Sequence, residues 1–286
     1  MSKIGTKVGI AGGGIMGQGI ALVAATAGAE VLVYDVNEQV LANAQEKIED
    51  FTQKGVERGK MTAAQRLDLL NRIEYTVHVH ELVGPLMIEA IPEKLEYKQD
   101  LFRQLEAQNA ADSIFATNTS SIPVTQIAGG LQRPERVVGM HFFNPAPLMQ
   151  LVEVIAAEAT DPGVVAQIIQ LCRSWGKTPA VVKDTPGFIV NRVARHYYLE
   201  SLELVEAGIG GVETVDKLLE NAGFRMGPFR LMDLIGVNTN HRVSESLYEQ
   251  FYQAPRFRPS RLQQKKVEAG HWGQKSGKGF YDYREA

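Results

Sequence analysis

The sequence has few of the features that mark secreted, membrane or nucleic-acid-binding proteins. It contains one cysteine, Cys172, so no disulfide can form within the chain, and a reducing compartment such as the cytoplasm is expected. No apolar run approaches the ~20 residues of a membrane-spanning helix. The strand-like "KVGIAG" begins at residue 7, so no targeting peptide is expected before it. Because the net charge is only −3, neither nucleic acid nor an anionic membrane is an expected partner.

The chain of 286 residues is 44% hydrophobic and 22% charged, which suits a soluble enzyme of two domains. Up to about residue 186, strand-like runs alternate with helical segments. This alternation predicts a doubly wound, mostly parallel α/β sheet of the Rossmann type over residues 1–186. From residue 187 to 286 the apolar spacing is helical almost throughout, so an all-helical second domain is expected.

The expected elements of the first domain start with a βαβ unit, in which strands at 7–12 and 30–35 flank a helix. Residues 37–73 follow as two amphipathic helices, which predicts a helical hairpin. Asn37 is the expected cap of its first helix, and a capping box from Thr62 to Gln65 opens its second. The last three strands, "RVVGMHFF", "QLVEVI" and "TPAVVK", are closely spaced, and an antiparallel arrangement is expected among them.

A glycine-rich turn joins the first strand to its helix. Gly12, Gly14 and Gly17 form G-x-G-x-x-G, and Asp35 ends the next strand. This context predicts a dinucleotide site in which the helix N-terminus holds the pyrophosphate and Asp35 holds the ribose. Since no basic residue accompanies Asp35 in "YDVNEQ", NAD is favoured over NADP. FAD shares this fingerprint, and a tight turn without a ligand is the structural alternative.

Two ionisable residues interrupt apolar strands. His141 ends the strand before "NPAPLMQ", and Glu153 lies between Val152 and Val154 in the strand after it. A buried carboxylate is costly unless it is paired. If the two strands are antiparallel neighbours, Glu153 can orient the imidazole of His141 as a general base. The alternative is a core histidine and an edge glutamate that are unrelated.

The other histidines are expected to be ordinary. His78 and His80 lie on one face of the predicted strand "YTVHV", but no further ligand accompanies them, so a surface position is favoured over a metal site. His196, His241 and His271 have polar neighbours and are also expected at the surface. No metal is predicted.

Two further polar sites stand out. "TNTSSIP" at 117–123 ends a strand with hydroxyls and an amide, which fits either a capped turn or donors that face the cofactor. Asn191 lies near the start of an otherwise apolar helix, where an amide needs a partner.

A series of motifs along the whole chain resembles the 3-hydroxyacyl-CoA dehydrogenase family, and most closely its short bacterial 3-hydroxybutyryl-CoA type. The motifs are "GGGIMGQGIA", "EAIPE", "NTSS", "HFFNPAPLMQLVEVI", "TPGFIVNR", "RMGPFRLMDLIG" and "KSGKGFYDY". The resemblance implies NAD-dependent, reversible oxidation of a short-chain (S)-3-hydroxyacyl-CoA to the 3-ketoacyl-CoA. It also implies a homodimer formed through the C-terminal helices.

The resemblance assigns roles to individual residues. His141 is the implied proton-transfer residue and Glu153 its partner, while Ser120 and Asn191 contact the reacting oxygen of the substrate. Lys54 and Lys60 in the helical hairpin are implied contacts for the phosphates of coenzyme A. The implied cofactor contacts are Gly12, Gly14, Ile15, Met16, Gly17, Asp35, Glu93, Lys98, Asn144 and Lys275.

Other functions share this scaffold. Arg225 stands in "GFRMGP" where many butyryl-type members have "HPMGP", and it suits either a carboxylated substrate such as 3-hydroxyadipyl-CoA or a surface position. L-gulonate 3-dehydrogenase would share His141 and Glu153 without needing coenzyme A. A non-catalytic, crystallin-like protein is the third alternative, and the retained set of Ser120, His141, Glu153 and Asn191 argues against it.

Overall fold

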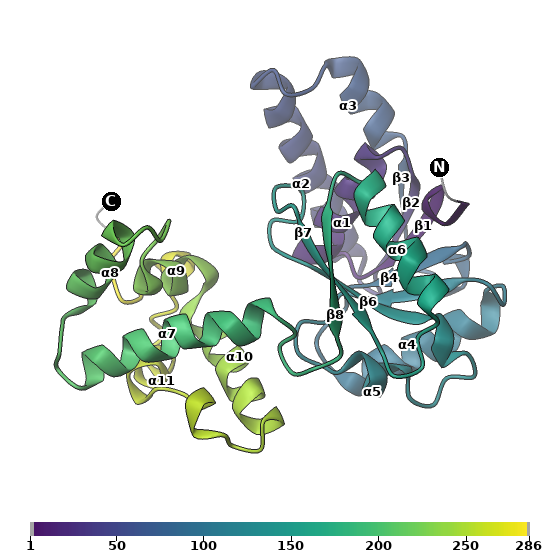
Figure 1. The fold of residues 1–286 in the computed structure, drawn as a ribbon. Coiled ribbons are helices and arrows are strands. Elements are labelled where there is room, and N and C mark those ends of the chain that lie inside the picture. Colours follow the sequence, from purple (N-terminus) through teal and green to yellow (C-terminus); the bar gives the residue numbers. More distant parts are fainter. Residues whose placement is uncertain (1–2, 285–286) are drawn as a thin grey trace. The chain divides into compact units, whose positions relative to one another are not determined.

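The computed structural model describes residues 3–284 and contains two compact units, Met1–Thr185 and Pro186–Ala286 (Figure 1). The first unit has strands alternating with helices, whereas the second is built of helices with two isolated β-bridges near its end. None of the helices in residues 3–284 is long and apolar enough to cross a membrane.

The first unit is built on one eight-stranded sheet, with the strand order β3-β2-β1-β4-β5-β6-β7-β8. The order reverses between β1 and β4, which is the switch point where doubly wound sheets bind ligands. The doubly wound α/β fold predicted from the sequence is therefore confirmed. The strands are β1 (Lys7–Ala11), β2 (Glu30–Tyr34), β3 (Ile73–Thr76), β4 (Leu86–Glu89), β5 (Ile114–Thr117), β6 (Val137–Phe142), β7 (Leu151–Ala156) and β8 (Thr178–Lys183).

The edge of the sheet departs from the parallel pattern. Strands β1 to β6 pair in parallel, β7 runs antiparallel to β6, and β8 runs parallel to β7. The expected antiparallel arrangement thus holds for β6 and β7 and is wrong for β7 and β8. The reason lies in the connections, since only the first is a short loop, while helix α6 crosses over between β7 and β8 and returns the chain in the same direction.

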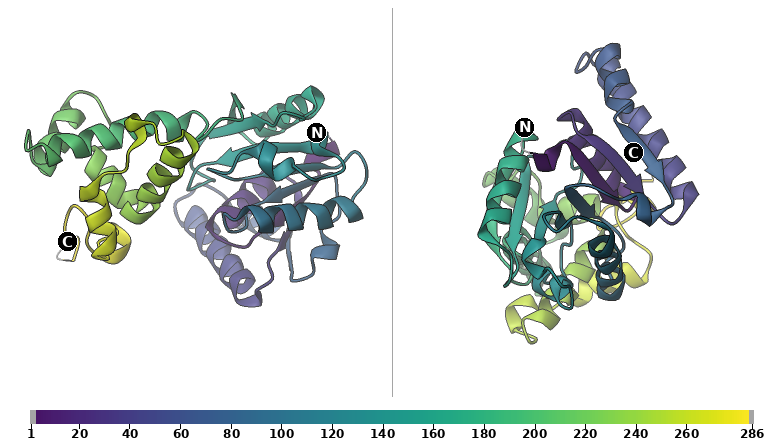
Figure 2. Two further views of the ribbon diagram at one scale, coloured as in Figure 1. Left: turned by 90° about the horizontal axis from the view of Figure 1, so that it is seen from below. Right: turned by 90° about the vertical axis from the view of Figure 1, so that its right-hand side faces the viewer.

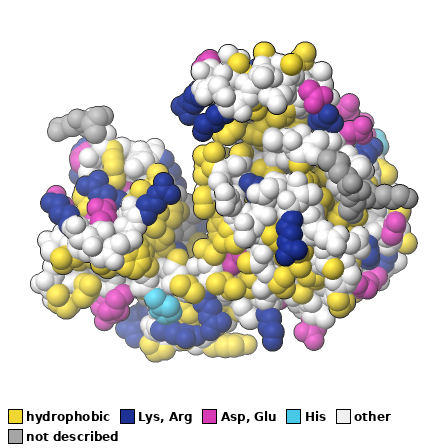
Figure 3. All heavy atoms as spheres, turned by 45° about the horizontal axis from the view of Figure 1, so that its top comes forward, with side chains coloured by type: hydrophobic (Ala, Val, Ile, Leu, Met, Phe, Trp, Pro, Cys, Tyr) yellow, Lys and Arg dark blue, Asp and Glu magenta, His cyan; other side chains and the backbone are white. Residues whose placement is uncertain are grey.

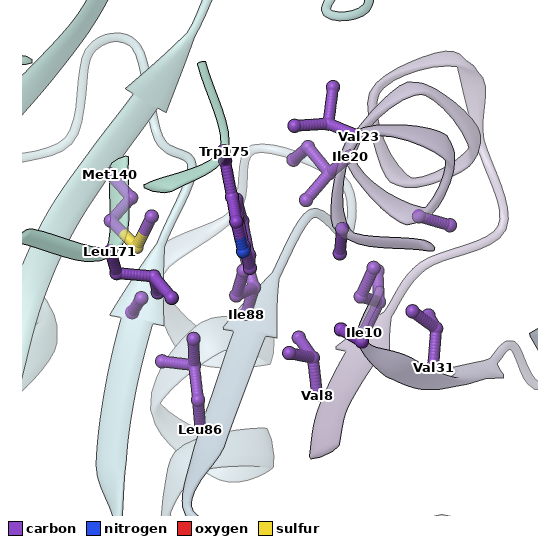
Figure 4. Close-up of a cluster of buried hydrophobic side chains, with 14 of the residues drawn as sticks. Val8, Ile10, Ile20, Val23, Val31, Leu86, Ile88, Met140, Leu171 and Trp175 are labelled. Atoms are coloured by element: carbon purple, nitrogen blue, oxygen red, sulfur yellow. The ribbon is translucent and has the colours of Figure 1, made fainter. Parts of the chain in front are cut away.

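Helices cover both faces of this sheet (Figure 2). Figure 4 shows Ile20 and Val23 of α1 on one face of the sheet. Leu171 of α6 and Trp175, which directly follows α6, belong to the same cluster. On the opposite face Phe102 of α4 packs against Phe115 of β5, with ring centres 6.1 Å apart. Because both faces are covered, the central strands β4, β5 and β6 are buried along their whole length. The helices of this unit are α1 (Ile15–Thr26), α2 (Glu38–Glu57), α3 (Ala63–Leu70), α4 (Leu95–Gln108), α5 (Val124–Ala128) and α6 (Pro162–Ser174).

The hairpin of α2 and α3 begins each helix at the residue expected from the sequence. Asn37 caps α2 by accepting a hydrogen bond from the Gln39 backbone, and Thr62 and Gln65 form the capping box of α3. Leu41 and Ile48 of α2 and Leu69 of α3 join the core cluster under α1. The hairpin is therefore anchored at one end by apolar burial.

The second unit is a set of helices around a small core. Tyr198, Leu202, Val215, Phe229 and Met232 form that core. The helices are α7 (Val190–Glu206), α8 (Val212–Asn221), α9 (Pro228–Ile235), α10 (Val237–Gln250) and α11 (Arg261–Glu268).

A glycine divides what the sequence presents as one helical segment, "GPFRLMDLIGVNTNHRVSESLYEQF". Gly236 has a φ of +102°, so α9 ends before it and α10 begins after it. This φ lies outside the right-handed helical region, and glycine reaches it at little steric cost. The continuous helical pattern therefore concealed a sharp turn.

Candidate cofactor and catalytic sites

The turn between β1 and α1 has the geometry that a dinucleotide needs. Gly12 has a φ of +109°, and a Cβ on Gly17 would lie 1.7 Å from the Gly12 carbonyl oxygen. Gly14 precedes α1, and a Cβ there would meet nothing within 4 Å. Gly12 therefore requires glycine for its backbone conformation, and Gly17 requires it because the Gly12 carbonyl is so close. Gly14 leaves open space at the N-terminus of α1, where phosphate binds well.

Asp35 lies beside this turn, one residue after β2. Its carboxylate accepts hydrogen bonds from the backbone of Gly13 (2.9 Å) and of Asn37 (3.1 Å). A cavity of 860 Å³ opens beside it, and the residues present therefore fit a nucleotide. It is lined by Gly12, Gly14, Ile15, Met16, Tyr34, Asp35, Val36, Asn37, Val40, Ala90, Ile91, Pro92, Tyr97, Asp100, Leu101 and Gln104.

A buried ion network lies behind the loop that carries Ser120. The ammonium of Lys98 contacts the carboxylates of Glu89 at 2.5 Å and Glu93 at 3.0 Å. Lys98 is 1% exposed and Glu89 is fully buried. One oxygen of Glu93 then accepts hydrogen bonds from the backbones of Ser120 and Ser121. Lys98 and Glu93, both implied cofactor contacts, therefore also hold the Ser120 loop in place.

The two carboxylates of this network respond differently to their surroundings. Burial raises the pKa of Glu89, although Lys98 and the Thr117 hydroxyl partly offset that effect. Partial burial acts in the same sense on Glu93, but Lys98 and the hydrogen bonds from Thr119 and Ser120 hold its pKa below the usual range. Lys98 thus provides the counter-charge for the buried Glu89 carboxylate and stabilises the ionised form of Glu93.

Glu89 was not among the residues selected from the sequence. It ends β4 within the apolar run "PLMIEAI", where its carboxylate also accepts hydrogen bonds from the Thr117 hydroxyl and the Ile91 backbone. A single carboxylate inside an apolar strand is the same signal that singled out Glu153. That signal was present in the sequence and would have found it.

The replacement Lys98→Met is expected to lower the free energy of unfolding of the first unit by about 3–5 kcal/mol, because it leaves Glu89 buried without its counter-ion. Urea unfolding measures the loss in a Trp272→Phe background, where the fluorescence comes from Trp175 in the core of the first unit. The double replacement with Glu89→Gln should recover part of it. Arg103→Met, which removes an exposed ion pair with Asp100, should cost less than about 1 kcal/mol. A loss of similar size in both single variants would contradict the network's role.

An amide connects the loop after β5 to the end of β6. Asn118 follows β5, and its side-chain oxygen accepts a hydrogen bond of 2.9 Å from the backbone of Phe142. Its own backbone donates to the Glu89 carbonyl. Asn118 thereby fixes the position of the residue next to His141, a role that the polar run "TNTSSIP" did not specify.

His141 and Glu153 face each other across the antiparallel strands β6 and β7. They are register partners, and the imidazole Nδ1 lies 2.8 Å from a Glu153 carboxylate oxygen. His141 is 5% exposed and Glu153 is fully buried. The short "NPAPLMQ" connection and the period of two along each strand place both side chains on one face of the sheet.

This pair has the arrangement of a base and its orienting carboxylate. An ionised Glu153 only accepts hydrogen bonds, so Nδ1 of a neutral His141 carries the proton and Nε2 is the acceptor. The carboxylate also stabilises the imidazolium that forms when Nε2 takes up a proton. The geometry therefore supports proton transfer at Nε2.

A second cleft, of 560 Å³, lies between the hairpin and the β6–β7 loop. Its wall is largely apolar, with a few basic side chains along it. Figure 3 shows dark-blue basic side chains beside yellow hydrophobic ones on the unit that carries the hairpin. Lys54 and Lys60 both line it, together with Arg58. The other lining residues are Leu22, Val23, Thr26, Ala27, Phe51, Gly55, Met61, Pro147, Leu148, Ser174, Trp175 and Lys177.

Lys177 lines this cleft and contacts the loop beside it. Its ammonium donates to the carbonyls of Ala146 at 2.6 Å and Met149 at 2.8 Å, which holds the β6–β7 loop. Burial lowers the pKa of this lysine. No sequence pattern marked Lys177, because a single lysine before a strand is common.

The remaining implied contacts lie apart along the chain. Asn144 is exposed in the β6–β7 loop and precedes a cis proline. Asn191 is the second residue of α7 and is half-buried. Lys275 lies in the second unit, with its ammonium 5.8 Å from the ring centre of Trp272. Their roles toward cofactor or substrate stay predictions.

Two expectations about histidines are wrong. Strand β3 ends at Thr76, so His78 and His80 do not share a strand face; His80 lies in a short 3₁₀ helix, Val79–Glu81. His241 is 6% exposed, not on the surface, and its Nε2 lies 3.4 Å from Glu245. Among residues 3–284 no group of three or more His, Cys, Asp or Glu side chains could hold a metal ion.

The fold and the glycine turn define the first unit as a dinucleotide-binding domain. Residues 7–185 match the model "3-hydroxyacyl-CoA dehydrogenase, NAD binding domain", and residues 187–283 match "3-hydroxyacyl-CoA dehydrogenase, C-terminal domain". The chain belongs to the 3-hydroxyacyl-CoA dehydrogenase family, and its first unit is an NAD-binding domain.

Curated relatives cover nearly all of this chain. The 3-hydroxyadipyl-CoA dehydrogenase of Escherichia coli K12 is 46% identical over 279 residues, which are 97% of this chain and 59% of that protein. The chain thus spans little more than half of that relative's length. The 3-hydroxybutyryl-CoA dehydrogenase of Mycobacterium tuberculosis is 37% identical over 99% of this chain and 100% of that protein.

Solved structures share the fold closely. A crystal structure of 3-hydroxybutyryl-CoA dehydrogenase from E. coli K12 has a TM-score of 0.95 and 46% identity, covering 98% of this chain and 60% of that one. The (S)-3-hydroxybutyryl-CoA dehydrogenase of Ralstonia eutropha has a TM-score of 0.93 and 34% identity, covering 97% of this chain and 98% of that one.

Proposed function

We propose that this chain is an NAD-dependent dehydrogenase that interconverts (S)-3-hydroxyacyl-CoA and 3-ketoacyl-CoA thioesters of short chain length. The observation that carries this proposal is the buried contact of 2.8 Å between His141 and Glu153 in a domain of the NAD-binding type. Relatives named for 3-hydroxybutyryl-CoA dehydrogenation over nearly the whole chain support the reaction.

In this proposal His141 is the proton-transfer residue. Its Nε2 takes the proton of the substrate's C3 hydroxyl during oxidation and returns it to the oxygen during reduction. Bound NAD supplies the hydride chemistry. Glu153 orients the imidazole and stabilises its charged form. Ser120, whose backbone is held by Glu93, and Asn191 contact the reacting oxygen, as the family resemblance implies.

The proposed site for coenzyme A is the cleft beside the hairpin. Its apolar wall suits the pantetheine chain and the adenine ring, while Lys54, Arg58 and Lys60 suit the phosphates. The cleft borders the β6–β7 loop through Pro147 and Leu148. The same loop carries Asn144 and joins the strands of His141 and Glu153, so a thioester bound there lies close to the proposed base.

Replacing Lys54 and Lys60 together with glutamine is expected to raise KM for acetoacetyl-CoA roughly tenfold while kcat is kept, because exposed ion pairs are worth up to ~1 kcal/mol each. Steady-state NADH oxidation measures both constants. The acetoacetyl thioester of N-acetylcysteamine, which lacks the phosphates, should be unaffected. Lys47→Gln, an exposed replacement on α2, the helix of Lys54, but outside the cleft, is the matched control. An unchanged KM for acetoacetyl-CoA in the double variant would contradict the assignment.

The reaction is tested by mixing the purified chain with NADH and acetoacetyl-CoA and following the absorbance of NADH. Rapid oxidation is the expected result. Turnover of L-gulonate with NAD⁺, without turnover of the thioester, would instead identify an L-gulonate 3-dehydrogenase. The absence of both activities would favour a non-catalytic structural protein. Either outcome would contradict the proposal.

We also propose that the chain acts as a homodimer in the cytoplasm. The second unit exposes large apolar side chains that an interface of its helices would cover, as the resemblance implies. Cys172, the one cysteine, is buried and unpaired, which suits a reducing compartment. The apolar side chains are Ile189, Val193, Ile209, Leu218, Phe224, Leu234, Ile235, Tyr252 and Trp272.

A further inference from the structure

The second unit contains a buried arginine without a carboxylate partner. Arg195 of α7 is 3% exposed. Its Nη1 donates to the carbonyl oxygen (2.8 Å) and the side-chain oxygen (3.0 Å) of Asn240, and to the Ser244 hydroxyl (2.9 Å). The guanidinium carbon lies 4.7 Å from the ring centre of Tyr198. Among residues 3–284 no Asp or Glu forms an ion pair with it.

All the hydrogen bonds of this guanidinium are made by one nitrogen. Nε is buried and has no partner, and Nη2 donates to no residue within the described part of the chain, 3–284. The amide nitrogen of Asn240 is likewise buried without a partner. Nε and Nη2 form one edge of the guanidinium, and their parallel N–H groups match the two oxygens of a carboxylate.

An unused edge of this kind points to a missing anion. Burial lowers the pKa of Arg195 to about 10, so the side chain is still charged near neutral pH. A buried charge and buried donors without acceptors are both costly. A carboxylate on the Nε–Nη2 edge would supply the counter-charge and two acceptors at once, and burial from water would make the interaction strong.

The position of Arg195 relates it to the proposed acyl substrate. It lies four residues after Asn191 on α7, so the two side chains are on one face of the helix, one turn and about 6 Å apart along its axis. In a six-carbon dicarboxylic chain, three carbon–carbon bonds separate C3 from the distal carboxyl carbon, a span of roughly 4 Å before its oxygens are counted. These two lengths are compatible.

We propose that Arg195, held by Asn240, binds the distal carboxylate of a dicarboxylic 3-hydroxyacyl-CoA of six carbons. This inference rests on the proposed function, in which Asn191 contacts the oxygen at C3. The reaction is that of the neutral substrate: the 3-ketone, NADH and a proton give the 3-alcohol and NAD⁺, and the distal carboxylate is unchanged. Arg195 therefore determines substrate class and takes no part in the chemistry.

Arg225, the arginine first considered for this role, is a weaker candidate. It is exposed in the loop before α9, so a carboxylate bound to it remains in water, where an ion pair contributes little. The relative that is 46% identical is named for a six-carbon dicarboxylic thioester, whereas a solved E. coli structure with the same identity is named for the four-carbon substrate. The unused edge of Arg195 favours the former.

The test compares kcat/KM for reduction of 3-oxoadipyl-CoA and of acetoacetyl-CoA by the full chain with NADH. The unaltered chain should prefer the dicarboxylic thioester at least about tenfold. Arg195→Met should lower that ratio by about tenfold or more, since it removes the charged hydrogen bonds. Asn240→Asp, which puts a carboxylate at the position 3.0 Å from Nη1, should lower it too by neutralising Arg195 internally. Arg225→Met should keep the ratio within about twofold.

The outcomes separate this site from a structural role. A purely structural Arg195 would lower kcat/KM for both thioesters equally in Arg195→Met and leave the ratio unchanged, which would overturn the inference. The inference would also be overturned if Arg225→Met abolished the preference for 3-oxoadipyl-CoA while Arg195→Met kept it. If Arg195→Met does not fold, Asn240→Asp and Arg195→Lys decide between the same results. Turnover of acetoacetyl-CoA without any preference overturns only this inference, whereas no NADH oxidation with either thioester overturns the proposed function with it.

Discussion

Replacing His141 with glutamine is expected to lower kcat for acetoacetyl-CoA by about two to four orders of magnitude. Glutamine occupies a similar volume and keeps a polar contact with Glu153, but its amide cannot exchange a proton with the reacting oxygen. NADH binding should be unchanged, because the glycine turn follows β1 and Asp35 follows β2, whereas His141 belongs to β6. Stopped-flow and steady-state absorbance at the NADH band measure the loss.

The control for this experiment is His196→Gln, which alters an exposed histidine of the second unit and should leave kcat within about twofold. Binding of NADH, followed by its fluorescence, shows that the His141 variant is folded. Full activity of that variant would remove His141 from the role of proton-transfer residue.

The replacement Glu153→Gln should reduce kcat by a comparable factor of about 10²–10⁴. Glu153 is fully buried and its oxygen lies 2.8 Å from Nδ1. A glutamine amide can donate to Nδ1 as well as accept from it. The imidazole can then carry its proton on Nε2, the tautomer that cannot act as the base, and the charge of an imidazolium is no longer balanced.

The same variant separates catalysis from stability. Because the exchange is isosteric and removes a buried charge, the free energy of unfolding should change by less than about 2 kcal/mol, as measured in urea. Glu158→Gln, at an exposed position two residues after β7, is the matched control and should retain kcat. If Glu153→Gln keeps full activity in a folded protein, the carboxylate does not orient the base.

Much of the fold could be predicted from the sequence because, along the first unit, the hydrophobic periodicity agrees with the residues that cap or end helices and strands. The strands before Gly12 and Asp35 are short, apolar and flanked by helical segments, and the caps Asn37 and Thr62 are local signals. The break at Gly236 was missed, since the apolar residues on either side keep a helical spacing across the turn. The direction of β8 was missed because helix α6, not strand spacing, sets it.

The candidate site was predicted unevenly for a physical reason. A carboxylate in an apolar strand is visible in the sequence, and this signal brought His141 and Glu153 together; the structure shows their contact, while their roles stay predictions. Glu89 carries the same signal but was passed over. The supporting contacts of Asn118 and Lys177 depend on which backbone groups meet in three dimensions, which no spacing along the chain reveals. Likewise, His241 has polar neighbours in sequence and yet is buried.

The central claim is that this chain uses His141 and NAD to interconvert a 3-ketoacyl-CoA and an (S)-3-hydroxyacyl-CoA. The most direct measurement incubates the full chain with acetoacetyl-CoA and NADH and determines NADH consumption together with the chirality of the product. The account predicts one (S)-3-hydroxybutyryl-CoA formed for each NADH oxidised, with the activity lost in the His141→Gln variant. No NADH oxidation, formation of the (R)-alcohol, or equal activity in that variant would contradict it.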